Sequence, residues 1–174
     1  MNGRDRWTRG LGVAGFIAML VGAVDPLEGS VLIFVGSGLV ALGAFLAHDA
    51  RRLVVYRTSV FVLIAAGVGA MWGLTAAGGF GGASGRTMWW GVLLLPYLAG
   101  WFMTVWGSGS PPWFSWLAMM IGLWYLAMPA MIFIRGAGRQ GPGLAAPLIL
   151  GAIGLVTIAG CVVRLRASSR SASR

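Results

Sequence analysis

Residues 144–163 read LAAPLILGAIGLVTIAGCVV, a run without a charged side chain. A helix that crosses the hydrocarbon core of a bilayer needs about 20 such residues. Similar apolar runs recur along the chain, separated by short stretches of glycine, proline or arginine. The sequence therefore predicts about six transmembrane spans, at residues 10–24, 31–47, 58–77, 88–106, 113–134 and 144–163.

The composition argues against a soluble globular protein. Hydrophobic residues make up 58% of the chain and charged residues only 10%, so a soluble fold would expose a large apolar surface. In lipid the backbone must satisfy its own hydrogen bonds, which leaves helices or closed barrels. Barrel strands alternate apolar and polar residues, whereas these runs are continuously apolar. We predict an all-α, polytopic integral membrane bundle with residues 1–163 as its single transmembrane domain.

The placement of arginine predicts the orientation in the membrane. With the N-terminus inside, the inner side carries Arg4, Arg6, Arg9, Arg51, Arg52, Arg57, Arg164, Arg166, Arg170 and Arg174. The outer side carries only Arg86, Arg135 and Arg139. Because positive charge is retained on the cytoplasmic side, we expect both termini in the cytoplasm and the chain in the plasma (inner) membrane of a bacterium.

The net charge of +9 at pH 7 is typical of nucleic-acid-binding proteins. The arginines flank the apolar runs instead of forming one patch, so the bilayer, and not nucleic acid, is the expected partner. Residues 164–174 alternate arginine with serine and alanine and are predicted to be a disordered basic tail. Residues 1–23 also resemble a secretory signal, whose cleavage is the alternative to a first span.

Glycine supplies small-residue faces within several of the runs. Such faces let helix backbones approach closely in lipid. The predicted packing residues are Gly36, Gly38, Gly69, Gly73, Gly151 and Gly154. We expect them to pack inside this bundle, with docking of a membrane-protein partner or a second copy of the chain as the alternative.

Four aromatic residues fall at middle depth in the fourth and fifth runs. Tyr97 and Trp101 are four residues apart and share one helix face. An antiparallel fifth span brings Trp124 and Tyr125 to a similar depth. Their N–H and O–H groups favour a protein environment. The four are predicted to lie between the two helices, as core residues or as the lining of a pocket for an apolar ligand.

The loop over residues 78–87 is rich in glycine and precedes the fourth run. Backbone N–H groups at a helix start, together with an arginine, can hold an anion. The candidates are Ser84, Gly85, Arg86 and Thr87. A turn that requires glycine, closed by a helix cap, is the simpler interpretation of the same residues.

Nothing in the sequence assembles a catalytic or metal site. His48 is the only histidine and Cys161 the only cysteine, too few ligands for structural zinc or a bis-histidine haem. The middle of each run lacks the ionisable residue that proton-coupled carriers place there. We expect no cofactor, and the sequence argues against an enzyme activity. The sequence predicts an accessory or structural subunit. The alternatives are a small transporter or channel for an apolar or neutral solute, and then a lipid-modifying enzyme.

Overall fold

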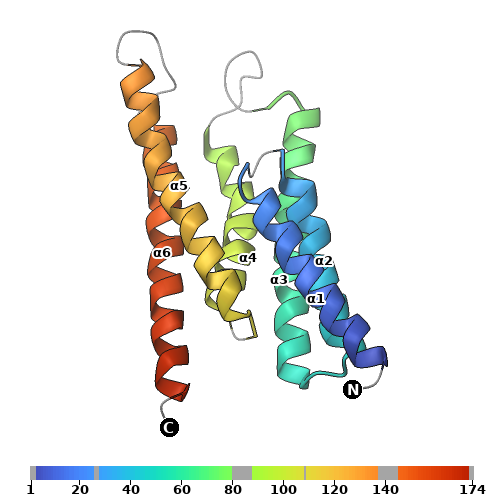
Figure 1. Cartoon of the computed structure of the whole chain (residues 1–174). Helices are drawn as coiled ribbons and strands as arrows, with labels where there is room; N and C mark the ends of the chain where they lie inside the picture. Colours follow the sequence, from blue (N-terminus) through green and yellow to red (C-terminus); the bar gives the residue numbers. More distant parts are fainter. Residues whose placement is uncertain (1–2, 26–27, 80–87, 108, 137–144, 173–174) are drawn as a thin grey trace. The chain divides into compact units, whose positions relative to one another are not determined.

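The computed structural model of the chain is built from helices (Figure 1). It describes residues 3–25, 28–79, 88–107, 109–136 and 145–172. All regular secondary structure within these ranges is helical. The all-α prediction is therefore confirmed for the part of the chain that the structure describes.

The helices lie close to the predicted runs. In chain order they are α1 (Gly3–Gly22), α2 (Ser30–Leu46), α3 (Arg51–Ala76), the 3₁₀ helix η2 (Met88–Leu94), α4 (Leu95–Trp106), α5 (Pro112–Gly136) and α6 (Ala145–Ala172). The fourth run differs from a single span of α-helix because its first part is η2. Pro96 has no N–H to donate to the carbonyl four residues earlier, so the α-helix begins with this proline in its first turn.

The chain divides into two compact units, where the sequence predicts one domain over 1–163. Unit 1 is Met1–Thr104 and unit 2 is Val105–Arg174. Within unit 1, α1 packs on α2, α2 on α3, and α3 on η2, while α5 packs on α6 in unit 2. Short connections bring consecutive helices together. Most packing is therefore between sequence neighbours, a grouping that hydropathy alone does not reveal.

Glycines bring α1 and α2 into backbone contact. A Cβ built on Gly36 would lie 2.6 Å from the carbonyl oxygen of Gly15, and one built on Gly15 would lie 2.5 Å from that of Gly36. Cβ atoms essentially never approach another atom within 3.0 Å. Only glycine fits at both positions, and Met19 is fully buried in the same unit.

The contact between α3 and α4 also depends on a glycine. A Cβ on Gly67 would lie 2.4 Å from the Cβ of Tyr97. Further along the two helices, the Tyr56 hydroxyl donates a hydrogen bond to the carbonyl of Met103. These contacts place the side chains of Tyr97 and Tyr56 between α3 and α4, within unit 1.

In unit 2, α5 and α6 approach at Gly122 and Gly154, where a Cβ on Gly154 would lie 2.6 Å from the carbonyl oxygen of Gly122. Helix α6 continues to Ala172, although the sequence predicts a disordered tail from residue 164. Arginine, leucine and alanine are good helix formers, and extending an existing helix avoids the cost of nucleation. The alternation of arginine and serine did not outweigh this effect.

The helix surfaces expose many large apolar side chains, among them Val21, Val62, Leu117, Leu155 and Val163. Within the described residues, two helices are long and apolar enough to cross a membrane. These are α3 and the Leu148–Ser169 part of α6. Ser30–Leu46 and Trp90–Trp106 are apolar but shorter. Membrane association is therefore supported by two helices.

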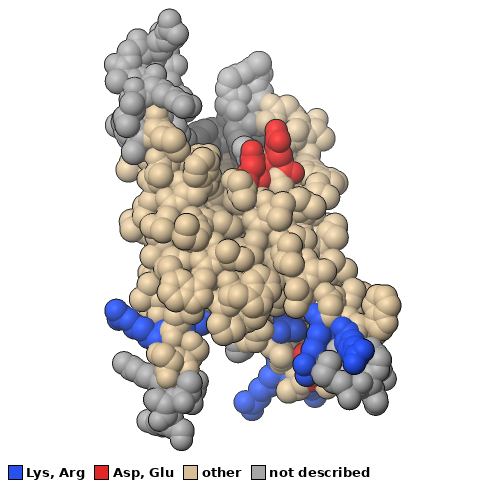
Figure 2. Space-filling model, viewed as in Figure 1, with Lys and Arg blue, Asp and Glu red and all other residues tan. Residues whose placement is uncertain are grey.

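The acidic and the basic residues of unit 1 lie mostly at opposite ends of the unit. Asp25 and Glu28 lie in the link between α1 and α2, and the acidic atoms there form a patch at one end of the unit (Figure 2). Arginines at the start of α1 and the start of α3 lie at the opposite end (Figure 2). Asp49 lies among them, 3.7 Å from the guanidinium of Arg57. Arg57 is half-buried, whereas Arg6, Arg9, Arg51 and Arg52 are exposed.

Candidate functional site

A cavity of about 730 Å³ lies within unit 2, between the end of α4, the start of α5 and the second half of α6. Its lining residues are Trp106, Ser110, Pro112, Ser115, Ala159, Gly160, Val163, Arg164, Leu165, Ala167 and Ser168. The volume is in the range of pockets that hold small organic ligands. No aspartate or glutamate is among these lining residues.

The start of α5 forms one wall of the cavity. Gly109 has a positive φ of 89°, which glycine adopts without strain. Pro112 is the first residue of α5, where a missing N–H is tolerated and the fixed φ suits the helix. The N–H of Phe114 donates to the carbonyl of Pro111 at 3.0 Å. This turn places Ser110 and Ser115 beside the C-terminal part of α6.

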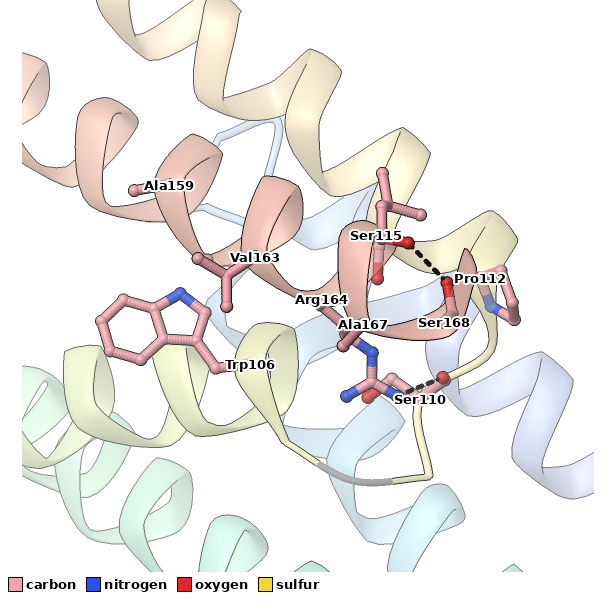
Figure 3. Close-up of a pocket in the computed structure, with 11 residues that line it drawn as sticks. Trp106, Ser110, Pro112, Ser115, Ala159, Val163, Arg164, Ala167 and Ser168 are labelled. Carbon is pink, nitrogen blue, oxygen red and sulfur yellow. Dashed lines mark hydrogen bonds between the residues drawn. The ribbon is translucent and has the colours of Figure 1, made fainter. Parts of the chain in front are cut away.

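Polar groups gather at one end of the cavity (Figure 3). The Arg164 guanidinium donates to the carbonyl oxygen of Ser110 at 2.6 Å, so its charge is held at the cavity wall. The Ser168 hydroxyl donates to the carbonyl of Leu165 at 2.8 Å. Ser115 is fully buried, and its Oγ has no hydrogen-bond partner among the described residues. A buried hydroxyl in this state is destabilising by about 1–3 kcal/mol.

The other end of the cavity is apolar (Figure 3). Here Ala159 and Val163 of α6 lie near the indole of Trp106. The indole sits directly on Gly160, because a Cβ built there would overlap its Nε1 at 1.5 Å. Gly160 therefore provides the space that the indole occupies. The cavity is amphipathic, with a cation and hydroxyl groups at one end and hydrocarbon at the other.

The predicted aromatic residues fall in both units. Tyr97 and Trp101 are buried in unit 1, and Tyr125 is buried in unit 2. Trp124, also in unit 2, is 44% exposed, and its predicted position opposite Tyr97 and Trp101 stays a prediction. Neighbouring residues on a helix point about 100° apart, which allows Tyr125 to be buried while Trp124 is exposed. Equal depth did not determine which face each residue occupies.

The predicted packing glycines have two kinds of surroundings: some face a neighbouring helix and others face open space. Gly36 lies at the α1–α2 crossing, and Gly38 faces the ring of Phe61, with a hypothetical Cβ 3.2 Å from it. In unit 2, Gly154 lies at the α5–α6 crossing, and a Cβ on Gly151 would be 3.9 Å from Pro129. A Cβ on Gly69 or Gly73 would meet no described atom within 4 Å. The structure therefore shows no described packing partner for these two glycines, and their place at a helix crossing inside the bundle stays a prediction.

The predicted anion-binding residues of the outer loop, Ser84, Gly85, Arg86 and Thr87, lie outside the described residues. The described part of the chain contains no group of three or more histidine, cysteine, aspartate or glutamate residues that could hold a metal ion. Cys161 is buried within α6. The structure therefore adds no metal ligand set to the candidate site.

The cavity was not predicted from the sequence. From the sequence, Arg164 predicts only the orientation of the chain, and Ser115 is one of several serines near the ends of apolar runs. The available signal was an arginine directly after an apolar run, with a serine four residues later on the same helix face. Comparison with protein family models, curated proteins and solved structures gives no match to this chain.

Proposed function

We propose that this chain is a six-span helical membrane protein that acts as an accessory subunit, and that one face of α3 packs against a helix of another membrane protein. The exposed apolar side chains on its helices support the bilayer placement. A span needs about 17–25 residues. α1 has 20 residues, α2 has 17 and α5 has 25, so these helices reach that range as well.

The charge distribution supports an orientation with both termini in the cytoplasm. In unit 1 the arginine-rich end includes the start of α1 and the link between α2 and α3, and the acidic link between α1 and α2 is opposite. In unit 2, Arg164 and Arg166 follow the apolar part of α6. Arginine on the cytoplasmic side is the arrangement that membrane insertion favours.

The observation that carries the accessory role is the open face of α3. Gly69 and Gly73 are exposed, and no described atom lies within 4 Å of the position where a Cβ would stand. Val62 and Ala66 are also exposed and continue the same face by helical spacing. In lipid, helices associate through small residues that allow close backbone contact. A GxxxG pair that meets no described atom of its own chain suits a partner helix.

A substitution pair tests the partner face. Gly69→Leu combined with Gly73→Leu should leave the yield of the folded protein near that of the wild type, because both positions are open. The same protein should lose its co-purifying membrane subunit when native mass spectrometry is recorded after gentle solubilisation. The control is Ala152→Leu, which adds bulk at an exposed position of α6. A wild-type protein that is only a lone monomer would contradict the accessory role.

The orientation is tested by labelling single cysteines in a Cys161→Ala background. Glu28→Cys should react with an impermeant thiol reagent in sealed cells, because the acidic link is assigned to the outer side. Ser169→Cys should react only after the membrane is opened. Labelling of position 169 in sealed cells would refute the proposed orientation.

A further inference from the structure

We propose that the cavity in unit 2 binds the phosphate headgroup of an anionic phospholipid from the cytoplasmic leaflet. This inference rests on the membrane placement proposed above, since it places the C-terminal part of α6 at the inner interface. It does not depend on the partner face of α3. Three features of the cavity support a lipid headgroup: the Arg164 cation, the buried Ser115 hydroxyl in its wall, and its apolar end.

The polar end of the cavity is suited to an anion. The Arg164 guanidinium is fixed there by its bond to the Ser110 carbonyl, and a guanidinium presents several N–H donors in a fork that matches phosphate oxygens. The cavity lining includes the first residue of α5, Pro112. The N-terminus of a helix of 25 residues carries partial positive charge. None of the lining residues supplies a negative charge.

Ser115 is the independent observation that points to a ligand. Ser115 belongs to the cavity wall and is fully buried, and its Oγ has no hydrogen-bond partner among the described residues. Buried hydroxyls are nearly always paired, so an acceptor that reached this one from the cavity would remove the cost of leaving it unpaired. A phosphate oxygen accepts from both a serine hydroxyl and an arginine.

The apolar end distinguishes a lipid from a free anion. Ala159, Val163 and the Trp106 indole form a hydrocarbon surface next to the polar end (Figure 3). Tryptophan is enriched where the bilayer meets water, and Arg164 directly follows the apolar run that ends at Val163. A headgroup at the cation with the start of an acyl chain along the indole matches both ends. Inorganic phosphate would use only one of them.

The test uses the full chain in detergent, titrated with phosphatidylglycerol or with phosphatidylcholine of the same acyl chains. Bound lipid is counted by native mass spectrometry. Phosphatidylglycerol should bind at least about tenfold more tightly, because the zwitterionic choline headgroup adds a cation beside Arg164. Arg164→Gln should weaken phosphatidylglycerol binding about tenfold or more, the effect of losing a charged hydrogen bond. The matched control Arg166→Gln, on the same helix and outside the cavity lining, should change binding less than about twofold.

Ser115→Ala separates a binding role from a structural role. Removal of an unpaired buried hydroxyl should keep or raise the unfolding temperature of the lipid-free protein. The same variant should bind phosphatidylglycerol about three- to tenfold more weakly, because a hydrogen bond to the headgroup is lost. A lower unfolding temperature with unchanged lipid binding would show that the hydroxyl serves packing, and would overturn the proposal.

Inorganic phosphate provides the second arm of the test. At matched concentrations it should not displace bound phosphatidylglycerol, because it lacks the acyl contacts. Displacement by phosphate, equal binding of the two lipids, or equal losses in Arg164→Gln and Arg166→Gln would each overturn the lipid site. In each of these outcomes the protein would still be recovered in the membrane fraction, so the membrane placement would stand. Recovery of the chain in the soluble fraction would overturn the membrane placement itself.

Discussion

Gly36 of α2 and Gly69 of α3 both lie within apolar helices, but their surroundings are opposite. Gly36 is buried, and a Cβ there would lie 2.6 Å from the carbonyl oxygen of Gly15. Gly69 is exposed, and a Cβ there would meet no described atom within 4 Å. The first glycine is required by a helix crossing inside the chain. The second is available to a molecule outside it.

This difference shows what a small-residue pattern does and does not specify. Glycine four residues from glycine permits close approach of two backbones, but the pattern does not say which helix approaches. At the α1–α2 crossing the connection is short and the neighbour is the next helix in the chain. On α3, Val60, Ile64 and Val68 are buried inside unit 1, and the glycine face is turned away from them. The accessory role proposed above depends on this separation.

The largest expected effect is from Gly36→Leu. Its neighbour is the backbone of α1, which cannot rotate away as a side chain can, so α1 must shift or separate. We expect a loss of at least about 3 kcal/mol in the free energy of unfolding, the upper end of overpacking effects. The measurement is thermal unfolding in detergent, together with the yield of monodisperse protein.

Gly69→Leu is the matched control, since it adds the same side chain to the next helix. Its unfolding temperature should stay near that of the wild type because the added atoms enter open space. Equal losses in the two variants would remove the distinction between a crossing inside the chain and a face open to a partner.

The positions of the helices were predictable from the sequence, whereas their faces were not. Long apolar runs specify helix existence because lipid offers the backbone no other hydrogen-bond partner. The α3 and α6 helices exceed their predicted runs, with Arg51 and Ala172 as their outer ends, because good helix formers extend an existing helix. Which side of a helix is buried depends on the neighbours. The sequence therefore predicts that Trp124 and Gly69 lie on helices, but it does not predict that Trp124 is 44% exposed or that Gly69 meets no described atom.

The candidate site was less predictable than the fold. Arg164, Ser115 and Trp106 come from two helices and from the end of a third, and each has an ordinary role at a membrane interface. Only the packing of α5 on α6 brings Ser110 to 2.6 Å from the Arg164 guanidinium. A sequence pattern within one helix cannot show a cavity formed by several.

The smallest expected effect, and the sharpest test of the comparison, is at two adjacent residues of α3. Val68 is 4% exposed and Gly69 is open. Val68→Ala should lower the free energy of unfolding by about 1–2 kcal/mol, since two methyl groups lose their packing contacts. Gly69→Ala should raise it by about 0.5–1 kcal/mol, because alanine restricts the unfolded chain and its methyl group meets no neighbour. Opposite signs measured for the isolated chain in detergent are expected. A loss at Gly69→Ala as large as that at Val68→Ala would show that Gly69 packs against this same chain, and the partner face of α3 would then have to be abandoned.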